Sequence, residues 1–129
     1  MKKNSKIYIA GHNGMVGSAI IRNLKSKGYD NLVFIPSQKY NLINQMIVND
    51  FIEKEQPDYV INAAAKVGGI LANNTYRAQF IYENLMIQNN LIHAAHENEI
   101  EKFLFLGSSC IYPKFAPQPI KEEYLLNGD

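Results

Sequence analysis

A regularly spaced glycine triplet, set between a β-prone run and an amphipathic stretch, most constrains the fold of this chain. Gly11, Gly14 and Gly17 follow the run Lys-Ile-Tyr-Ile-Ala at residues 6–10, and apolar residues then recur at helical spacing over residues 15–24. The pyrophosphate of a dinucleotide needs a tight turn, a backbone without a Cβ in its way and free N–H groups at a helix N-terminus. The triplet alone would also suit a tight turn beneath a closely packed helix. The strand and helix on either side favour a phosphate-binding turn.

The rest of the chain repeats this alternation of strand and helix. Further β-prone runs and helically spaced apolar residues follow in turn at residues 32–35, 43–52, 59–61, 80–95 and 102–106. The alternation predicts an α/β fold, a Rossmann-type doubly wound parallel sheet. From right-handed crossovers we expect the strand order 3-2-1-4, with Gly11 and Ser108 facing one crevice beyond the strand ends.

The number of predicted strands is small for such a fold. Sheets of this type usually have about six strands, and only four are predicted here, so the last would leave an exposed apolar edge. We therefore interpret residues 1–129 as the N-terminal part of a dinucleotide-binding domain, without a substrate domain.

Composition excludes several classes of protein. Hydrophobic residues make up 47% and charged residues 19% of the chain, and the net charge is +1, which gives no electrostatic case for binding nucleic acid or a membrane. The single cysteine, Cys110, excludes an internal disulfide and suits a reducing compartment. The apolar run after Lys2 and Lys3 is too short for a signal peptide. We expect a cytoplasmic protein.

The choice of dinucleotide depends on residues beyond the second strand. NAD sites usually carry an acidic residue there, about 20 residues after the glycines, for the ribose 2′-OH. No acidic residue lies between Asp30 and Asp50, which favours NADP because a carboxylate would repel the 2′-phosphate. The arginine expected at an NADP site is also missing, and Lys39 is the nearby cation, so NAD stays open.

Small and nucleophilic residues follow the third and fourth strands. Ala64 and Ala65 would let a cofactor lie against the backbone, or would equally serve close helix packing. Ser108 could donate a hydrogen bond to a substrate carbonyl or could cap a loop. Cys110 taken alone is a small hydrophobe. His93 and His96 share a helix face without a third ligand, so we predict no metal site.

Taken together, these residues resemble the extended short-chain dehydrogenase/reductases of the NAD-dependent epimerase/dehydratase type, and among them the GDP-L-fucose synthases. The resemblance runs over essentially the whole chain. Its matching stretches are residues 9–20, 63–70, 73–76 and 105–113. The stretches at 66–70 and 107–113 are the ones particular to fucose synthases.

The resemblance implies that GDP-4-keto-6-deoxy-D-mannose is epimerised at C3 and C5 and then reduced at C4 by NADPH. Ser108 matches the serine that polarises the C4 oxygen, and Cys110 matches the cysteine of proton transfer in epimerisation. Asn13 and Ser37 stand where relatives can carry arginines near the adenosine phosphate. Family members commonly form homodimers, with the helix at residues 80–95 as a plausible contact. The predicted cofactor-binding residues are Gly11, His12, Asn13, Gly14, Met15, Val16, Gly17, Ser37, Asn41, Leu42, Ala64, Ala65, Leu106 and Gly107.

One family element is missing from this stretch. The family uses Tyr-x-x-x-Lys, and none of the eight tyrosines here has a lysine four residues later. The resemblance therefore implies that these residues alone do not turn over. The alternatives are another nucleotide-sugar epimerase or dehydratase, a non-catalytic dinucleotide-binding module, or a degraded coding sequence. Cys110 argues against the first of these, because those enzymes need no thiol there.

Overall fold

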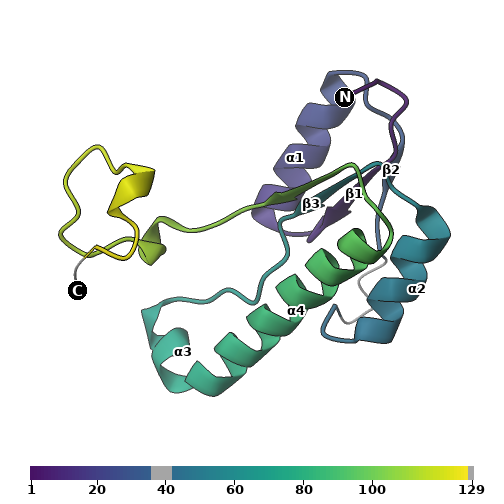
Figure 1. Cartoon of the computed structure of the whole chain (residues 1–129). Helices are drawn as coiled ribbons and strands as arrows, with labels where there is room; N and C mark the ends of the chain where they lie inside the picture. Colours follow the sequence, from purple (N-terminus) through teal and green to yellow (C-terminus); the bar gives the residue numbers. More distant parts are fainter. Residues whose placement is uncertain (36–41, 128–129) are drawn as a thin grey trace.

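The computed structural model describes residues 1–35 and 42–127, and within them a four-stranded parallel sheet is flanked by helices (Figure 1). This confirms the predicted Rossmann-type α/β fold. The strands are β1 (Ile7–Ala10), β2 (Leu32–Val33), β3 (Tyr59–Asn62) and β4 (Lys102–Phe105). The helices are α1 (Met15–Ser26), α2 (Gln45–Glu55), α3 (Ile70–Thr75) and α4 (Arg77–Glu97).

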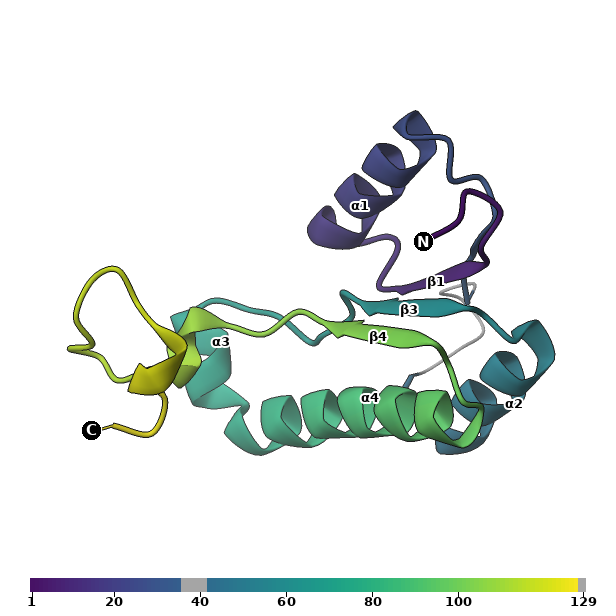
Figure 2. The ribbon, with the colours of Figure 1, turned by 45° about the horizontal axis from the view of Figure 1, so that its top comes forward.

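The helices form two layers, one on each side of the sheet. Figure 2 shows α1 on one face and the pair α2 and α4 on the other. The main core lies under that pair, where Tyr8, Val48, Val60 and Leu91 are at most 1% exposed. All four residues of β1 are buried, because β1 has a strand on either side and helices on both faces.

The predicted strand order 3-2-1-4 is wrong. The observed order is β2-β1-β3-β4, with β3 hydrogen-bonded beside β1, Ile7 opposite Tyr59 and Ala10 opposite Asn62. The reason lies in β2, which has two residues and offers only two ladder positions. A strand that short gives little edge for another strand, so the chain crosses back over β1. The direction of winding therefore reverses between β1 and β3, and this places the crevice there.

Two helices differ from their predicted form. The short helix α3 was not predicted, and α4 is longer than residues 80–95. The apolar residues Ile81, Leu85 and Ile92 of α4 are 44 to 63% exposed, whereas Phe80 and Leu91 are buried. No helix among residues 1–35 and 42–127 is both long and apolar enough to cross a membrane.

Strand β4 forms an apolar edge, as predicted. In the described part of the chain it pairs with β3 alone. Leu104, Phe105 and Leu106 are 49%, 47% and 41% exposed. Phe103, the neighbour of Leu104, packs instead against the core. Exposed apolar edges of this kind promote self-association.

We expect Leu104→Lys to reduce self-association of the chain without unfolding it, because a lysine on an exposed strand face blocks edge-to-edge pairing. Phe103→Lys is the matched control on the same strand, and it should unfold the chain by burying a charge against the core. Light scattering and circular dichroism measure the two effects. Equal aggregation of Leu104→Lys and the unchanged chain would contradict the expectation.

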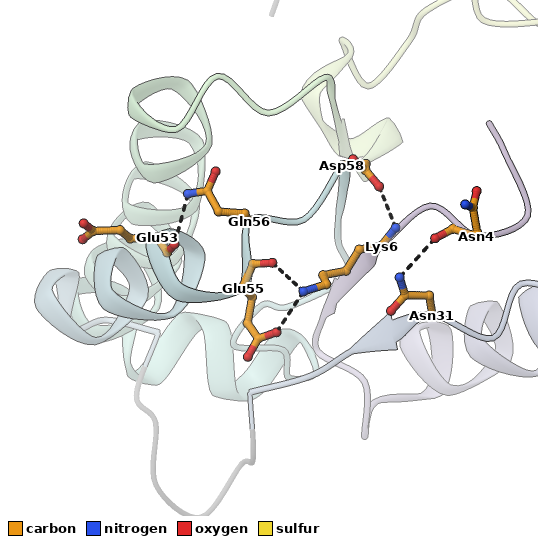
Figure 3. A network of polar contacts seen from close by, with 7 residues as sticks. All are labelled: Asn4, Lys6, Asn31, Glu53, Glu55, Gln56 and Asp58. Carbon is orange, nitrogen blue, oxygen red and sulfur yellow. Dashed lines mark hydrogen bonds and ion pairs between the residues drawn. The ribbon is translucent and has the colours of Figure 1, made fainter.

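A polar network joins the amino-terminal ends of β1 and β3, away from the strand ends that carry the glycine turn (Figure 3). The Lys6 backbone N–H donates to the Asp58 carboxylate at 2.7 Å, and the Lys6 ammonium donates to the Glu55 carbonyl at 2.8 Å. On the β2 side, the Asn31 amide donates to the Asn4 carbonyl at 3.1 Å. These contacts tie the start of β1 to the α2–β3 connection and to the residues before β2.

Candidate dinucleotide-binding site

The glycine turn at residues 11–17 joins β1 to α1 and leaves no room for a Cβ at Gly11 or Gly17. Gly11 has φ +81°, a conformation that side chains with a Cβ rarely adopt, and a Cβ there would lie 2.6 Å from the Ala63 carbonyl oxygen. A Cβ on Gly17 would collide with the Gly11 carbonyl. The N–H of Gly14 closes the turn by donating to the Gly11 carbonyl at 3.0 Å. Glycine is therefore required for packing at both ends of the turn.

The helix α1 begins directly after this turn. Gly14 is its N-cap and offers no side-chain acceptor to the first N–H groups of the helix. Those groups and the helix dipole favour an anion at this position. A Cβ in the glycine turn would crowd its backbone, and no side chain caps the first N–H groups of α1. Such a turn at a helix N-terminus fits a pyrophosphate. Met15, at the first helical position, is 86% exposed.

The turn also touches the end of β3. The Ala63 N–H donates to the Ala10 carbonyl at 3.0 Å, and the Asn62 side chain accepts from the Ala64 N–H at 3.0 Å. Gly11 therefore meets Ala63 and Ala64, whereas the predicted order placed Ser108 directly opposite it. Since β3 lies between β1 and β4, the alanines separate the glycine turn from Ser108.

Two hollows adjoin this region. The first has a volume of about 160 Å³ and lies on the β2 side. It is lined by Tyr8, Gly11, His12, Asn13, Gly14, Ile35 and Leu42. The Tyr8 hydroxyl is buried, with no hydrogen-bond partner among the described residues. Burial raises the pKa of this phenol, so it stays neutral at physiological pH. The His12 ring lies 5.1 Å from that of Phe34, centroid to centroid, and closes the hollow beside the turn.

The second hollow, of about 530 Å³, lies toward β4. Its lining is mainly apolar and comes from the start of α1, from the ends of β3 and β4 and from α4. The residues are Val16, Asn62, Ala63, Ala64, Ala65, Asn84, Gln88, Phe105, Leu106, Gly107, Ser108 and Ile111. The two hollows lie on either side of the glycine turn, as the two halves of a dinucleotide would.

Ser108 caps a single 3-10 turn, Ser109–Ile111, and its oxygen accepts the Cys110 N–H at 3.1 Å. The structural interpretation of this serine as a cap is therefore correct. In this hydrogen bond the serine oxygen is the acceptor, so the bond does not use the hydroxyl proton. Cys110 is a free, exposed thiol and does not line either hollow.

Comparison with known proteins agrees with this geometry. The profile of the NAD dependent epimerase/dehydratase family matches residues 7–129. The chain belongs to this family.

Relatives in this epimerase/dehydratase family are close. The chain is 59% identical over 126 residues to GDP-L-fucose synthase 1 of Arabidopsis thaliana, covering 98% of the chain and 39% of the relative. It is 57% identical over 123 residues to GDP-L-fucose synthase of Escherichia coli, covering 95% of the chain and 38% of the relative. The chain thus spans about two fifths of the length of these relatives.

Solved structures of other proteins superpose closely on the chain. MlghC, a GDP-mannoheptose C4 reductase from Campylobacter jejuni with NADP bound, has a TM-score of 0.94 at 50% identity. The match covers 100% of this chain and 41% of that one. The fold of this chain is therefore shared with the corresponding part of that reductase.

The structure distributes the predicted site residues of this epimerase/dehydratase chain over the two hollows. The predicted residues that line the β2-side hollow are Gly11, His12, Asn13, Gly14 and Leu42. Those that line the β4-side hollow are Val16, Ala64, Ala65, Leu106, Gly107 and Ser108. Gly17 is buried beneath the turn, and Met15 is exposed outside both hollows. The predictions for Ser37 and Asn41 lie outside the described residues.

Sequence reasoning missed the amide side chains of α4 that line the β4-side hollow, Asn84 and Gln88. The Asn84 oxygen accepts the Lys66 N–H at 2.7 Å, and its amide donates to the Lys66 carbonyl at 3.1 Å. The Lys66 ammonium lies 2.9 Å from the Glu83 carboxylate and holds the pKa of that carboxyl below its usual range. The backbone at Lys66 is thus anchored on α4. Two amides at positions i and i+4, which share one face of a helix, were the available signal.

Proposed function

We propose that this chain is the dinucleotide-binding, N-terminal part of a GDP-L-fucose synthase. One observation carries the proposal: Val16, Ala64 and Ser108, which come from three separate elements, line one hollow beside the glycine turn. A dinucleotide laid with its pyrophosphate on the turn places its reactive end in that hollow. The close relatives named GDP-L-fucose synthase support this assignment.

The chain's own residues fit NADPH and the reduction of a ketone. The glycine turn holds the pyrophosphate, and the small side chains of Ala64 and Ala65 let the cofactor approach the backbone. When bound, NADPH supplies the hydride for the C4 carbon of the sugar. The Ser108 hydroxyl, whose oxygen accepts the Cys110 N–H at 3.1 Å, donates its proton toward the C4 oxygen. That hydrogen bond stabilises the negative charge that develops on this oxygen.

Cys110 supplies the proton chemistry of epimerisation in this proposal. Epimerisation at C3 and C5 removes a proton beside the C4 carbonyl and returns it on the opposite face. A thiol has a pKa closer to neutrality than a hydroxyl, so it can transfer the proton on one face of the sugar, and a second acid–base group completes the exchange on the opposite face. Cys110 is an exposed, free thiol two residues after Ser108, at the edge of the β4-side hollow that Ser108 lines.

A second candidate function is reduction of a GDP-heptose at C4 without epimerisation. The likeness to MlghC, at 50% identity over the whole chain, favours it. Such a reduction uses the Ser108 hydroxyl but needs no proton transfer by the Cys110 thiol. We therefore prefer the assignment as a fucose synthase.

The proposed partners follow from the same assignment. A nucleotide sugar is the substrate, and a homodimer would cover the exposed α4 residues Ile81, Leu85 and Ile92. The one free cysteine suits the reducing cytoplasm.

A chimera tests the activity. Residues 1–129 are joined to the remaining part of the Escherichia coli relative, which contributes the Tyr-x-x-x-Lys that this stretch lacks. We expect NADPH oxidation with GDP-4-keto-6-deoxymannose and none with the 129-residue chain alone. Oxidation with a GDP-4-keto-heptose and not with the deoxymannose substrate would instead support the second candidate. A folded chimera active on neither sugar would reject both.

We expect the chain to bind NADPH about tenfold more tightly than NADH, because no acidic residue lies between Asp30 and Asp50 to repel the 2′-phosphate. Fluorescence titration of the reduced nicotinamide, in the 129-residue chain and in the chimera, measures both affinities. Tighter binding of NADH would overturn the choice of NADP.

A further inference from the structure

Asn90 is a polar side chain in the middle of the core. It lies on α4 beside Leu91, four residues before the buried Ala94, and is 3% exposed. Burying an amide costs free energy unless its hydrogen bonds are made. A buried asparagine in the core is therefore expected to form hydrogen bonds with groups inside the fold.

Both partners of Asn90 lie on one short segment far away in the sequence. Its side-chain nitrogen donates to the Leu42 carbonyl and to the Ile43 carbonyl, each at 2.9 Å. An amide nitrogen has two hydrogens, so these two bonds use its full donating capacity. The segment continues into Asn44, the N-cap of α2, whose side chain accepts the Ile47 N–H at 3.3 Å. Asn90 thus fastens the turn before α2 to α4.

The fastened segment forms a wall of the β2-side hollow. Leu42 lines that hollow opposite Gly11 and Gly14, and it also packs against the core cluster. On the proposed function, the reactive end of the dinucleotide lies beside Ser108 in the other hollow. The adenosine end then lies on the β2 side, against Leu42.

We propose that Asn90 is a positioning residue for the dinucleotide site, which holds Leu42 in place as the wall of the adenosine half. This inference rests on the proposed function for the identity of the ligand. Asn90 does not touch the ligand. It acts through two backbone carbonyls, so its effect is confined to the half of the cofactor that Leu42 contacts.

The test compares the two halves of the cofactor in the 129-residue chain. Asn90→Leu removes both donors and keeps the volume. We expect the affinity for 2′-phospho-ADP-ribose to fall about tenfold and that for reduced nicotinamide mononucleotide to stay unchanged. Hydrogen exchange at the amides of residues 43–47 should also become faster, as the segment loses its anchor.

Two controls separate positioning from stability. Asn89→Leu changes the same residue type at the neighbouring, exposed position of α4 and should change neither affinity. Ile52→Val weakens the core on α2 but removes neither Asn90 hydrogen bond, so it lowers stability and should leave the ratio of the two affinities unchanged. If Asn90→Leu fails to fold, Asn90→Ser, which is too short to reach both carbonyls, replaces it.

The outcomes are distinct. Equal loss of both fragments, or no loss of either, overturns the inference. If the unchanged chain and the chimera bind no NADPH, the proposed function fails and the ligand assignment with it. The exchange rates of residues 43–47 then decide whether Asn90 holds this segment, and unchanged rates in Asn90→Leu would show that it does not.

Discussion

Gly17→Ala is expected to abolish detectable dinucleotide binding and to lower the free energy of unfolding by about 3 kcal/mol. The added Cβ would collide with the Gly11 carbonyl oxygen and lie 2.7 Å from the Gly11 carbonyl carbon. Both atoms belong to the backbone of the turn, so neither can rotate away as a side chain would. The start of α1 has to move outward, and the N–H groups that it presents to the pyrophosphate move with it.

Urea unfolding and NADPH titration measure the two effects of Gly17→Ala. Gly69→Ala is the matched control, because a Cβ at Gly69 meets no atom within 4 Å and φ is −70° there. That control should change the free energy of unfolding by less than about 1 kcal/mol, because the lower unfolded-state entropy of alanine is offset by its poorer fit at the N-cap of α3. A Gly17→Ala chain with unchanged stability and affinity would mean that α1 adjusts without disturbing the turn.

Cys110→Ser is expected to reduce epimerisation by the chimera about 10²- to 10⁴-fold, the usual contribution of a general acid or base. The hydroxyl is similar in size to the thiol but has a much higher pKa, so it cannot exchange protons near neutral pH. Reduction of a sugar that already has the product configuration at C3 and C5 should continue, because the Ser108 hydroxyl is unaffected.

Incorporation of solvent deuterium at C3 and C5, followed by NMR, measures the epimerisation step separately from NADPH oxidation. Ser109→Ala, a change at the exposed neighbour of Cys110, is the control and should leave both steps intact. Undiminished deuterium incorporation by Cys110→Ser would assign the proton transfer to another group and would favour the simple reductase as the function.

Local pattern was enough to predict the class of fold and the phosphate-binding turn. The β-prone runs, the helical spacing of apolar residues and the glycine triplet each act over a few neighbouring residues, so they can be recognised without knowing the contacts. The exposed edge of β4 was predictable for the same reason, since a sheet of four strands must have two ends.

The arrangement in space required the tertiary structure. The order β2-β1-β3-β4 depends on β2 having only two residues in the ladder, and its sequence suggested four. That order decides that Gly11 meets Ala63 and that Ser108 lies one strand farther away. Likewise, nothing near Asn90 in the sequence indicates Leu42, which is 48 residues away. Long-range pairs of this kind depend on how whole elements pack together, whereas local pattern predicted the four strands, the longer helices and the positions where the backbone has to be glycine.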